Sequence, residues 1–210
     1  MTGAQNSGEG LWSAFAATGE LGRDPDSRWR WWFDGHARFF DDSDGFETSI
    51  VRPGIGYEVG ENTTAWFGYA WIRNDPVSGG FDEHRIWQQL IWSRSYDWGT
   101  PFLRTRLEQR FDDRGSETGW RLRQFARWTR PLRDESRLSW RIWDEVFYEL
   151  NDTNWGQDAG FRQNRAFAGM GWKLDDSLTL EFGYLNQHFW RDAADDVNNH
   201  VLGVTLLGSF

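Results

Sequence analysis

The stretch 102–127 alternates between apolar and charged residues, and this pattern limits what the chain can fold into. Its first half places Leu103, Leu107 and Phe111 on one parity, with arginines and a glutamate on the other. Its second half repeats the pattern, and the intervening sequence DDRGSETG is polar and contains glycine. Because successive strand residues point to opposite faces, the stretch predicts a β-hairpin with one apolar and one ionic face.

The two faces of this hairpin differ from those of an ordinary soluble sheet. A solvated face usually mixes Lys, Thr, Glu and Ser, whereas this polar face is almost entirely Arg and Glu. The apolar face carries Trp120 and Trp128 at its ends. This combination predicts a β-barrel whose outer wall touches lipid and whose interior is ionic.

The overall composition also favours an ionic interior. The chain has 22 arginines and a single lysine, Lys173. Arginine keeps its charge and offers a planar fork of donors, so it suits ion pairs packed at close quarters. A merely solvated surface would have no reason to exclude lysine.

Length, charge and cysteine content exclude several classes of protein. With 210 residues and no Pro/Gly/Ser-rich linker, the chain is expected to form one domain. A formal net charge of −9 argues against a nucleic-acid partner. The absence of cysteine rules out disulfide scaffolds and thiolate metal sites, and it suits an oxidising periplasm or outer membrane.

Hydropathy alone does not identify a membrane protein here. No run of 18 apolar residues is present, and the mean hydropathy of −0.74 is typical of soluble proteins. Half of every barrel strand is polar, however, so this average does not exclude a barrel. Residues 1–10 lack the apolar core of a signal peptide, so the chain is either a cytoplasmic protein or a mature outer-membrane chain whose signal peptide has been removed. We expect the second, because a membrane barrel needs export.

Alternating segments continue along the chain and give eleven candidate strands. They cover residues 11–21, 28–40, 48–59, 64–73, 83–96, 102–111, 120–128, 137–150, 161–174, 178–191 and 200–210. From the third strand onward, short turns alternate with longer loops, which is typical of bacterial outer-membrane barrels. We therefore predict an all-β, antiparallel up-and-down transmembrane β-barrel of ten to twelve strands over residues 11–210, preceded by a disordered segment at 1–10.

The first candidate strand does not fit a simple count. Single-chain bacterial barrels have even strand numbers, and the sorted loops make 28–210 a consistent set of ten strands. The segment 11–21 is then an eleventh strand, a segment inside the lumen, or half of a pair whose partner the sequence does not reveal.

Charged residues on the inward parity are the main candidates for function. The expected lumen-lining residues are Arg30, Arg38, Glu83, Arg85, Arg104, Arg106, Glu108, Arg110, Arg121, Arg123, Arg141, Glu145 and Arg165. They indicate either an ion-selective pore or substrate ladder, or cross-strand pairs that plug a narrow barrel. By parity, fifteen basic residues, including Arg28, Arg137 and Lys173, face seven acidic ones, so small anions are candidate partners.

Tryptophans flank the candidate strands. The expected interfacial aromatic residues are Trp29, Trp71, Trp92, Trp120, Trp128, Trp140 and Trp190, and Trp66 flanks a strand in the same way. Such residues form girdles at the two membrane surfaces. The alternative is a set of sugar-stacking platforms on a soluble carbohydrate-binding barrel or sandwich.

Some outward-parity residues do not fit a lipid-facing wall. These are Gln88, Gln109, Gln124 and Asp144, which are all polar. They indicate bulges, positions near the membrane surface, or a contact with protein.

The last strand carries a specific local signal. Leu202, Val204, Leu206 and Phe210 share one parity, and Phe210 is the last residue given. A terminal Phe on an alternating strand resembles the assembly signal of bacterial outer-membrane proteins. It predicts that the barrel-assembly machinery and outer-membrane lipid are partners.

No catalytic residue, metal site or cofactor is expected. The four histidines have no metal-ligand partner at a suitable spacing. Ser139 and His36 share the inward parity, as in a lipid hydrolase of the outer membrane, but sequence separation alone cannot reveal a triad. A lipid hydrolase therefore stays a third alternative.

Several short motifs occur together in order along the chain: EHRIWQQL from Glu83, then LRTRLEQRF, GWRLRQFAR, FRQNRAFAGMGWKL and LEFGYLNQ. They resemble an uncharacterised bacterial family, domain of unknown function 2490, from about Trp12 to Phe210. The resemblance implies an outer-membrane β-barrel of Gram-negative bacteria, without an assigned activity or catalytic residues. Together with the pattern above, it favours a structural or narrow porin-like role.

Overall fold

The protein forms eleven strands in the part of the chain that its computed structural model describes, residues 7–22, 24, 26–40, 45–75, 79–191 and 195–210. The strands are β1 (Glu9–Glu20), β2 (Trp29–Phe40), β3 (Gly45–Gly60), β4 (Thr63–Asn74), β5 (Phe81–Ser93), β6 (Thr100–Asp112), β7 (Gly119–Pro131), β8 (Leu138–Glu149), β9 (Gly160–Lys173), β10 (Leu178–Phe189) and β11 (Val197–Ser209). Their alternating patterns place one set of side chains inside and the other outside.

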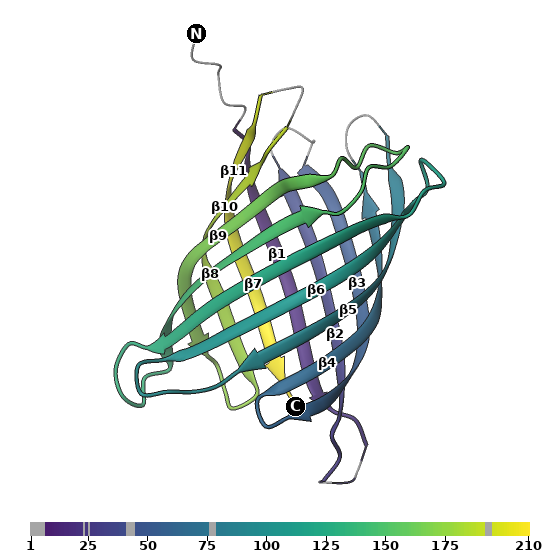
Figure 1. Cartoon of the computed structure of the whole chain (residues 1–210). Coiled ribbons are helices and arrows are strands. Elements are labelled where there is room, and N and C mark those ends of the chain that lie inside the picture. The colour runs from purple at the N-terminus through teal and green to yellow at the C-terminus, as the bar shows by residue number, and fades with distance from the viewer. Residues whose placement is uncertain (1–6, 23, 25, 41–44, 76–78, 192–194) are drawn as a thin grey trace.

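These strands close into one barrel (Figure 1). Every neighbouring pair is antiparallel except the pair that closes the barrel, in which β1 and β11 run parallel. This follows from the odd number, because eleven alternating strands leave the first and last pointing in the same direction. The all-β barrel prediction is therefore confirmed, and the segment 11–21 is an eleventh strand of the wall.

The N-terminal segment differs in part from the expectation of disorder over 1–10. Glu9 and Gly10 already belong to β1, paired with His200 and Val201 of β11. Residues 1–6 lie outside the described part of the chain.

The connections are sorted between the two ends of the barrel. Strands β2, β4, β6, β8 and β10 end, and strands β3, β5, β7, β9 and β11 begin, at one end of the barrel, which we call the loop end (Figure 1). The other end, which we call the turn end, holds the C-terminus and the remaining connections. The segment between β1 and β2 is the longest connection at the turn end.

Hydrophobic side chains fill part of the interior on the β2–β5 side. Ile50, Ala70, Ile72, Trp66 and Trp87 form a buried cluster, and Trp87 is completely buried. Space for its ring comes from glycine, because a Cβ on Gly54 would lie 2.5 Å from Trp87 Cη2. A side chain at this position would therefore overlap the ring.

A second cluster lies on the opposite wall. Phe40, Phe167, Leu185 and Val201 are buried together, and Trp12 and Trp143 pack against them. The two clusters leave room between them, which charged side chains and a cavity occupy.

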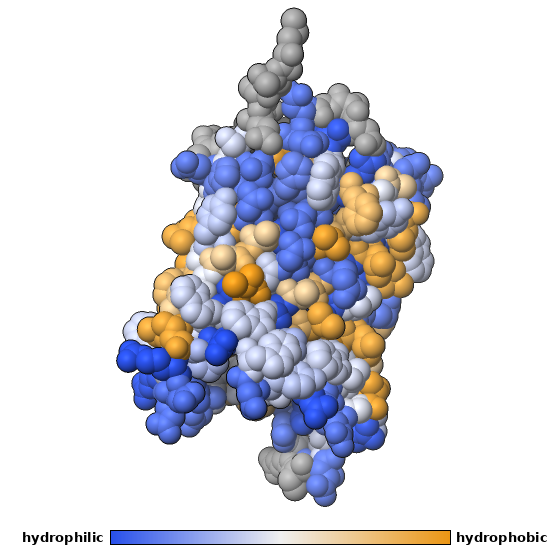
Figure 2. Space-filling model, turned by 60° about the vertical axis from the view of Figure 1, so that its left-hand side comes forward, coloured by the Kyte–Doolittle hydropathy of each residue, from blue (hydrophilic) through white to orange (hydrophobic). Residues whose placement is uncertain are grey.

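The outer wall is largely apolar. Leu90, Ile142, Tyr184 and Leu202, from four different strands, are each about half exposed. On the face in Figure 2, hydrophobic side chains gather in the middle and lower parts, between hydrophilic ends. Among the described residues there is no helix with the length and hydropathy needed to cross a membrane.

Candidate functional site

An ion-pair network crosses the interior of the barrel around Glu108. Its carboxylate accepts hydrogen bonds from Arg121 Nε at 2.9 Å and from Arg123 Nη1 at 2.7 Å. Arg85 and Arg106 lie farther from it, at 3.7 and 3.8 Å. Glu108 and Arg106 are completely buried. The single negative charge of Glu108 therefore lies among four arginines, away from water.

Glu145 forms a second centre of the network. It accepts from Arg104 Nη2 at 2.6 Å and from Arg123 Nη2 at 2.8 Å, and Arg165 lies 4.0 Å away. Arg104 is on β6 and Glu145 is on β8, so the contact reaches across the intervening strand β7.

Two further glutamates lie nearer the loop end. Glu83 accepts from Arg85 Nε at 2.7 Å and from Arg110 Nε at 2.5 Å. Glu149 pairs with Arg110 at 3.2 Å and with Arg121 at 3.5 Å. In all, four glutamates are shared by seven arginines: Arg85, Arg104, Arg106, Arg110, Arg121, Arg123 and Arg165.

Two other arginines of the interior differ from this group. Within the described ranges, neither Arg38 nor Arg127 has a carboxylate oxygen within 4.0 Å of its guanidinium group. Instead, Arg38 Cζ lies 4.2 Å from the centre of the Trp12 ring, and Arg127 Cζ lies 4.6 Å from the Phe102 ring. Both Nε atoms are buried without a hydrogen-bond partner.

Asp34, by contrast, is fully paired. Its carboxylate accepts from Trp32 Nε1 at 2.6 Å and from Arg52 Nε at 2.7 Å, and it bonds His36 Nε2 at 2.6 Å. Ser139 instead donates to the backbone carbonyl of Gly171 at 3.3 Å. The structure therefore does not bring Ser139 and His36 together as a nucleophile and its base.

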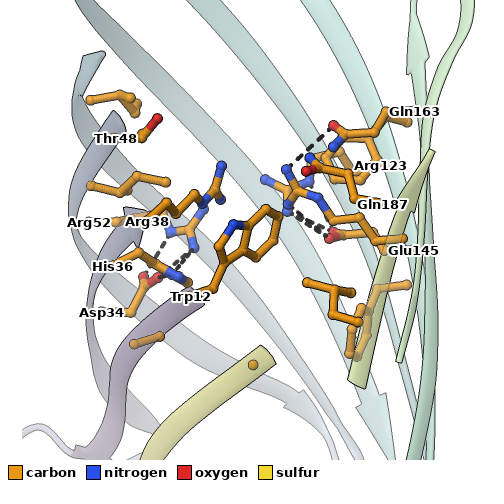
Figure 3. Close-up of a pocket in the computed structure, with 18 of the residues that line it drawn as sticks. Trp12, Asp34, His36, Arg38, Thr48, Arg52, Arg123, Glu145, Gln163 and Gln187 are labelled. Carbon is orange, nitrogen blue, oxygen red and sulfur yellow. Dashed lines mark hydrogen bonds and ion pairs between the residues drawn. The ribbon is translucent and has the colours of Figure 1, made fainter. Parts of the chain in front are cut away.

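A cavity of about 530 Å³ lies between the two hydrophobic clusters. Figure 3 shows Trp12 pointing into it, with Arg38 and Arg52 on one side and Arg123 and Glu145 on the other. Asn74 and Phe81, at the loop ends of β4 and β5, belong to its lining, so the cavity extends to the loop end.

Two tryptophan rings lie between this cavity and a smaller pocket at the turn end. Trp32 lines the cavity, whereas Trp66 lines a different pocket of about 270 Å³ that also contains Phe210. The Trp32 and Trp66 rings are in edge-to-face contact. They therefore stand between the two spaces.

Part of the loop end is covered by the β8–β9 connection. Trp155 Nε1 donates to the Glu117 carbonyl at 2.7 Å, which ties this loop to the β6–β7 connection. Arg110 Nη1 donates to Gln157 Oε1 at 3.0 Å, and the Arg110 guanidinium packs on the Trp155 ring. The loop is thus bonded to the interior network.

The expected lumen residues occupy four environments. Nine of them line the cavity: Arg38, Glu83, Arg85, Arg104, Arg110, Arg121, Arg123, Glu145 and Arg165. Arg106 and Glu108 are buried in the network, and Arg141 lies 3.7 Å from Glu181. Arg30 lines the turn-end pocket, where it pairs with Glu20 and Glu58.

Three basic residues assigned inward by parity are instead exposed. Arg28 and Arg137 lie just before their strands, and Lys173 ends β9. Lys173 donates to Asp176 at 2.7 Å, and this hydrogen bond lowers the pKa of the Asp176 carboxyl. The parity count was wrong here because side chains alternate between the two faces only inside a strand, and these residues lie at strand ends. The interior therefore has fewer cations than expected.

The tryptophans expected at the membrane surfaces lie on the outer wall near strand ends. Those near the loop end are Trp71, Trp120 and Trp190, and those near the turn end are Trp29, Trp92, Trp128 and Trp140. Their interfacial role stays a prediction. Trp66 was wrongly grouped with them, because it is buried inside the barrel.

Sequence reasoning missed the tryptophans that line the cavity, Trp12, Trp32 and Trp143. A signal was present for Trp32, which shares the parity of Arg30 and Asp34. The unpaired state of Arg38 had no such signal, because it depends on which carboxylates reach across the interior.

The polar residues of the outer wall are hydrogen-bonded to one another. Gln88 and Gln109 exchange two bonds of 3.0 Å between β5 and β6. Thr105 donates to Gln124 at 2.7 Å, and Asn164 donates to Asp144 at 2.9 Å. These side chains thus satisfy part of one another's hydrogen-bonding capacity.

The residues that the structure describes contain no cluster of three or more His, Asp and Glu side chains arranged to hold a metal ion. The carboxylates of the interior instead face guanidinium groups. The chemistry that this arrangement supports is recognition of charge.

Comparisons with known proteins identify the family through its sequence profile. An uncharacterized protein of Methylorubrum extorquens AM1 is 35% identical over 160 residues, which cover 75% of this chain and 70% of the relative. The siderophore receptor PirA from Pseudomonas aeruginosa is similar at a TM-score of 0.36 and 10% identity; the match covers 86% of this chain, which spans about a third (34%) of the receptor. The sequence profile of the proteins of unknown function DUF2490 matches residues 9–198. The chain therefore belongs to the DUF2490 family.

Proposed function

We propose that the protein is an outer-membrane β-barrel of Gram-negative bacteria whose lumen is closed by its own side chains. The observation that carries this proposal is the separation of residues across the wall. Charged pairs such as Arg123 with Glu108 are buried inside, while large apolar side chains such as Leu202 are exposed outside. A soluble barrel would place these two sets the other way round.

Aromatic residues at the strand ends also support a position in a membrane. Trp120 and Trp128 lie at opposite ends of β7 and point outward, as aromatic girdles do in outer-membrane barrels. Membrane lipid is then the principal partner of the outer wall. Phe210 would serve the barrel-assembly machinery as a recognition signal.

A closed lumen is favoured over a continuous pore. The Trp32–Trp66 contact stands between the cavity and the turn-end pocket. The glutamate–arginine network reaches these rings through Arg106, whose guanidinium packs on the Trp87 ring next to Trp32. The proposed role is therefore that of a stable membrane scaffold with a cavity open toward the loop end.

Fractionation and conductance test this proposal. The protein should stay in the membrane pellet after a carbonate wash, and unboiled samples should migrate differently from boiled ones on a denaturing gel. In planar bilayers the parent should be silent, whereas the Trp32→Ala, Trp66→Ala double variant should give conductance steps. Full solubility without detergent would contradict the membrane assignment and favour the soluble carbohydrate-binding alternative.

A narrow anion-selective pore is the second candidate. It is favoured by Arg38 and Arg127, whose guanidinium groups have no carboxylate within 4.0 Å among the described residues. Anion-selective steps from the parent protein, reversed by Arg123→Glu, would establish the pore and overturn the closed lumen.

A further inference from the structure

We propose that the cavity binds a small organic anion, with a carboxylate or phosphate group held by Arg38 and Arg165 and an apolar body packed on aromatic side chains. This inference concerns a ligand and goes beyond the membrane scaffold proposed above. It holds for the folded barrel in any environment, so the two proposals can fail separately.

Negative charge is scarce around the cavity. Glu145 is shared by Arg104, Arg123 and Arg165, and Arg165 is the most distant of the three, at 4.0 Å. Arg38 has no carboxylate that close in the described part of the chain. Arg38 is partly withdrawn from water, and a cation in that position without a partner is costly, so a bound anion would stabilise this region.

Neighbouring cations increase the need for an anion at Arg38. The positive charges of Arg85, Arg123 and Arg52 act on its guanidinium group, and the Glu47 carboxylate opposes them. Arg52 is already committed to Asp34. An anion beside Arg38 would thus meet an attractive field from several directions.

The Trp12 ring holds two of the arginines side by side in the cavity. Both Arg38 and Arg165 pack against the Trp12 ring, with Cζ at 4.2 and 4.8 Å from its centre. Stacking on an aromatic ring holds a guanidinium plane in place while leaving donors free at its edge. The Nε atom of Arg38 is buried and has no hydrogen-bond partner. In Figure 3 the Arg38 guanidinium lies beside Trp12 in the cavity.

The remaining lining decides what kind of anion fits. Trp143, Phe125, Phe167 and Leu185 present apolar surface to the cavity. The volume of about 530 Å³ lies within the range of pockets that hold small organic ligands, roughly 300–1,000 Å³. A bare inorganic anion would leave this apolar surface unused, so the lining favours an anionic group on an apolar body.

Calorimetric titration of the purified barrel in a non-ionic detergent tests the inference. The probes are benzoate and phenyl phosphate, with acetate lacking the ring and benzamide lacking the charge. We expect benzoate or phenyl phosphate to bind more tightly than acetate and benzamide. We also expect added salt to weaken binding, because the contact is electrostatic.

Variants assign the binding to Arg38. Arg38→Gln should weaken binding about tenfold, the usual effect of losing a charged hydrogen bond, and Arg38→Lys should weaken it less. Arg28→Gln is the matched control, because Arg28 is exposed and packs on Tyr57 outside the cavity. The shift between unboiled and boiled samples on a gel shows that each variant is folded.

Three results would overturn the proposal. They are a folded parent protein that binds neither benzoate nor phenyl phosphate, equal binding of benzamide and benzoate, and equal losses in Arg28→Gln and Arg38→Gln. None of them bears on whether the barrel lies in a membrane, which fractionation decides. A soluble protein that binds benzoate through Arg38 would retain this inference and reject the membrane scaffold.

Discussion

The rings of Trp32 and Trp66 meet edge to face inside the barrel, with centroids 5.5 Å apart and planes at 74°. The Trp87 ring stands 6.4 Å from that of Trp32 and completes the group. Edge-to-face pairs of this kind are favourable beyond the area that they bury. The three rings therefore form a rigid barrier across part of the lumen.

Adding a methyl group beside this barrier should destabilise the barrel. Gly54→Ala would place Cβ 2.5 Å from Trp87 Cη2, and overpacking costs about 1–3 kcal/mol. Gly35→Ala is the matched control on β2, because its Cβ would meet only the Ile50 carbonyl, at 3.6 Å. Urea unfolding in detergent measures both, and Trp87→Phe should rescue Gly54→Ala. Equal midpoints for the two alanine variants would contradict the packing argument.

Removing the charge of Glu108 should be among the most damaging changes. Glu108→Gln leaves Arg121 with Glu149 alone and Arg123 with Glu145 alone, and breaking a buried pair costs about 3–5 kcal/mol. Glu61→Gln, in the exposed β3–β4 turn, should leave the unfolding midpoint unchanged. The temperature at which the folded gel band disappears provides the measurement. A tolerated Glu108→Gln would show that the network has spare negative charge.

The amide pair on the outer wall should respond differently to single and double changes. Gln88→Leu leaves Gln109 without its partner, which costs about 1–3 kcal/mol where water is excluded. The double change Gln88→Leu, Gln109→Leu removes both polar groups and should be neutral or stabilising in lipid. Urea unfolding in lipid vesicles compares the three variants with the parent. A double variant that is less stable than both single variants would indicate that this surface contacts something polar.

Phe210 should stabilise the contact between β1 and its neighbours. Its ring stacks on Trp31 at 6.2 Å, its amide donates to the Thr18 carbonyl at 2.9 Å, and its carbonyl accepts from Glu20 N at 3.1 Å. Phe210→Ala should lower the free energy of unfolding by about 1 kcal/mol, whereas Phe67→Ala, at a similarly exposed position, should lower it less.

The expected role of Phe210 in assembly can be separated from this structural effect. An assembly signal predicts that Phe210→Ala lowers the amount of folded barrel in cells while refolding in detergent micelles succeeds. Equal membrane levels of variant and parent would contradict that role.

Alternation in the sequence was enough to predict the wall of the barrel. It placed Arg106, Glu108, Arg121 and Arg123 on the inward face. The register then sets Arg106 opposite Arg123 and Glu108 opposite Arg121 across the β6–β7 hairpin. This worked because strand side chains have a fixed period of two, so local pattern determines the face.

What the sequence could not reveal depends on distances across the interior. The contact between Arg104 on β6 and Glu145 on β8 skips a strand, and no local pattern encodes it. The parity of Trp32 places its side chain inside the barrel. This signal was overlooked because tryptophans were expected at the membrane surfaces. The parallel pairing of β1 with β11 follows from the odd strand count, which loop lengths alone left open.

The pairing of β1 with β11 is expected to form after the hairpins between successive strands. Gly8 N donates to Asn199 Oδ1 across 191 positions of the chain, so this contact joins its two extremities. Closing so long a loop carries a larger entropy cost than forming any of the hairpins between successive strands. During synthesis, β1 can pair with β2 early, but its other edge has no partner until β11 has been made. An open strand edge readily pairs with other chains, so a chain that has not yet closed its barrel exposes one edge of its first strand to aggregation.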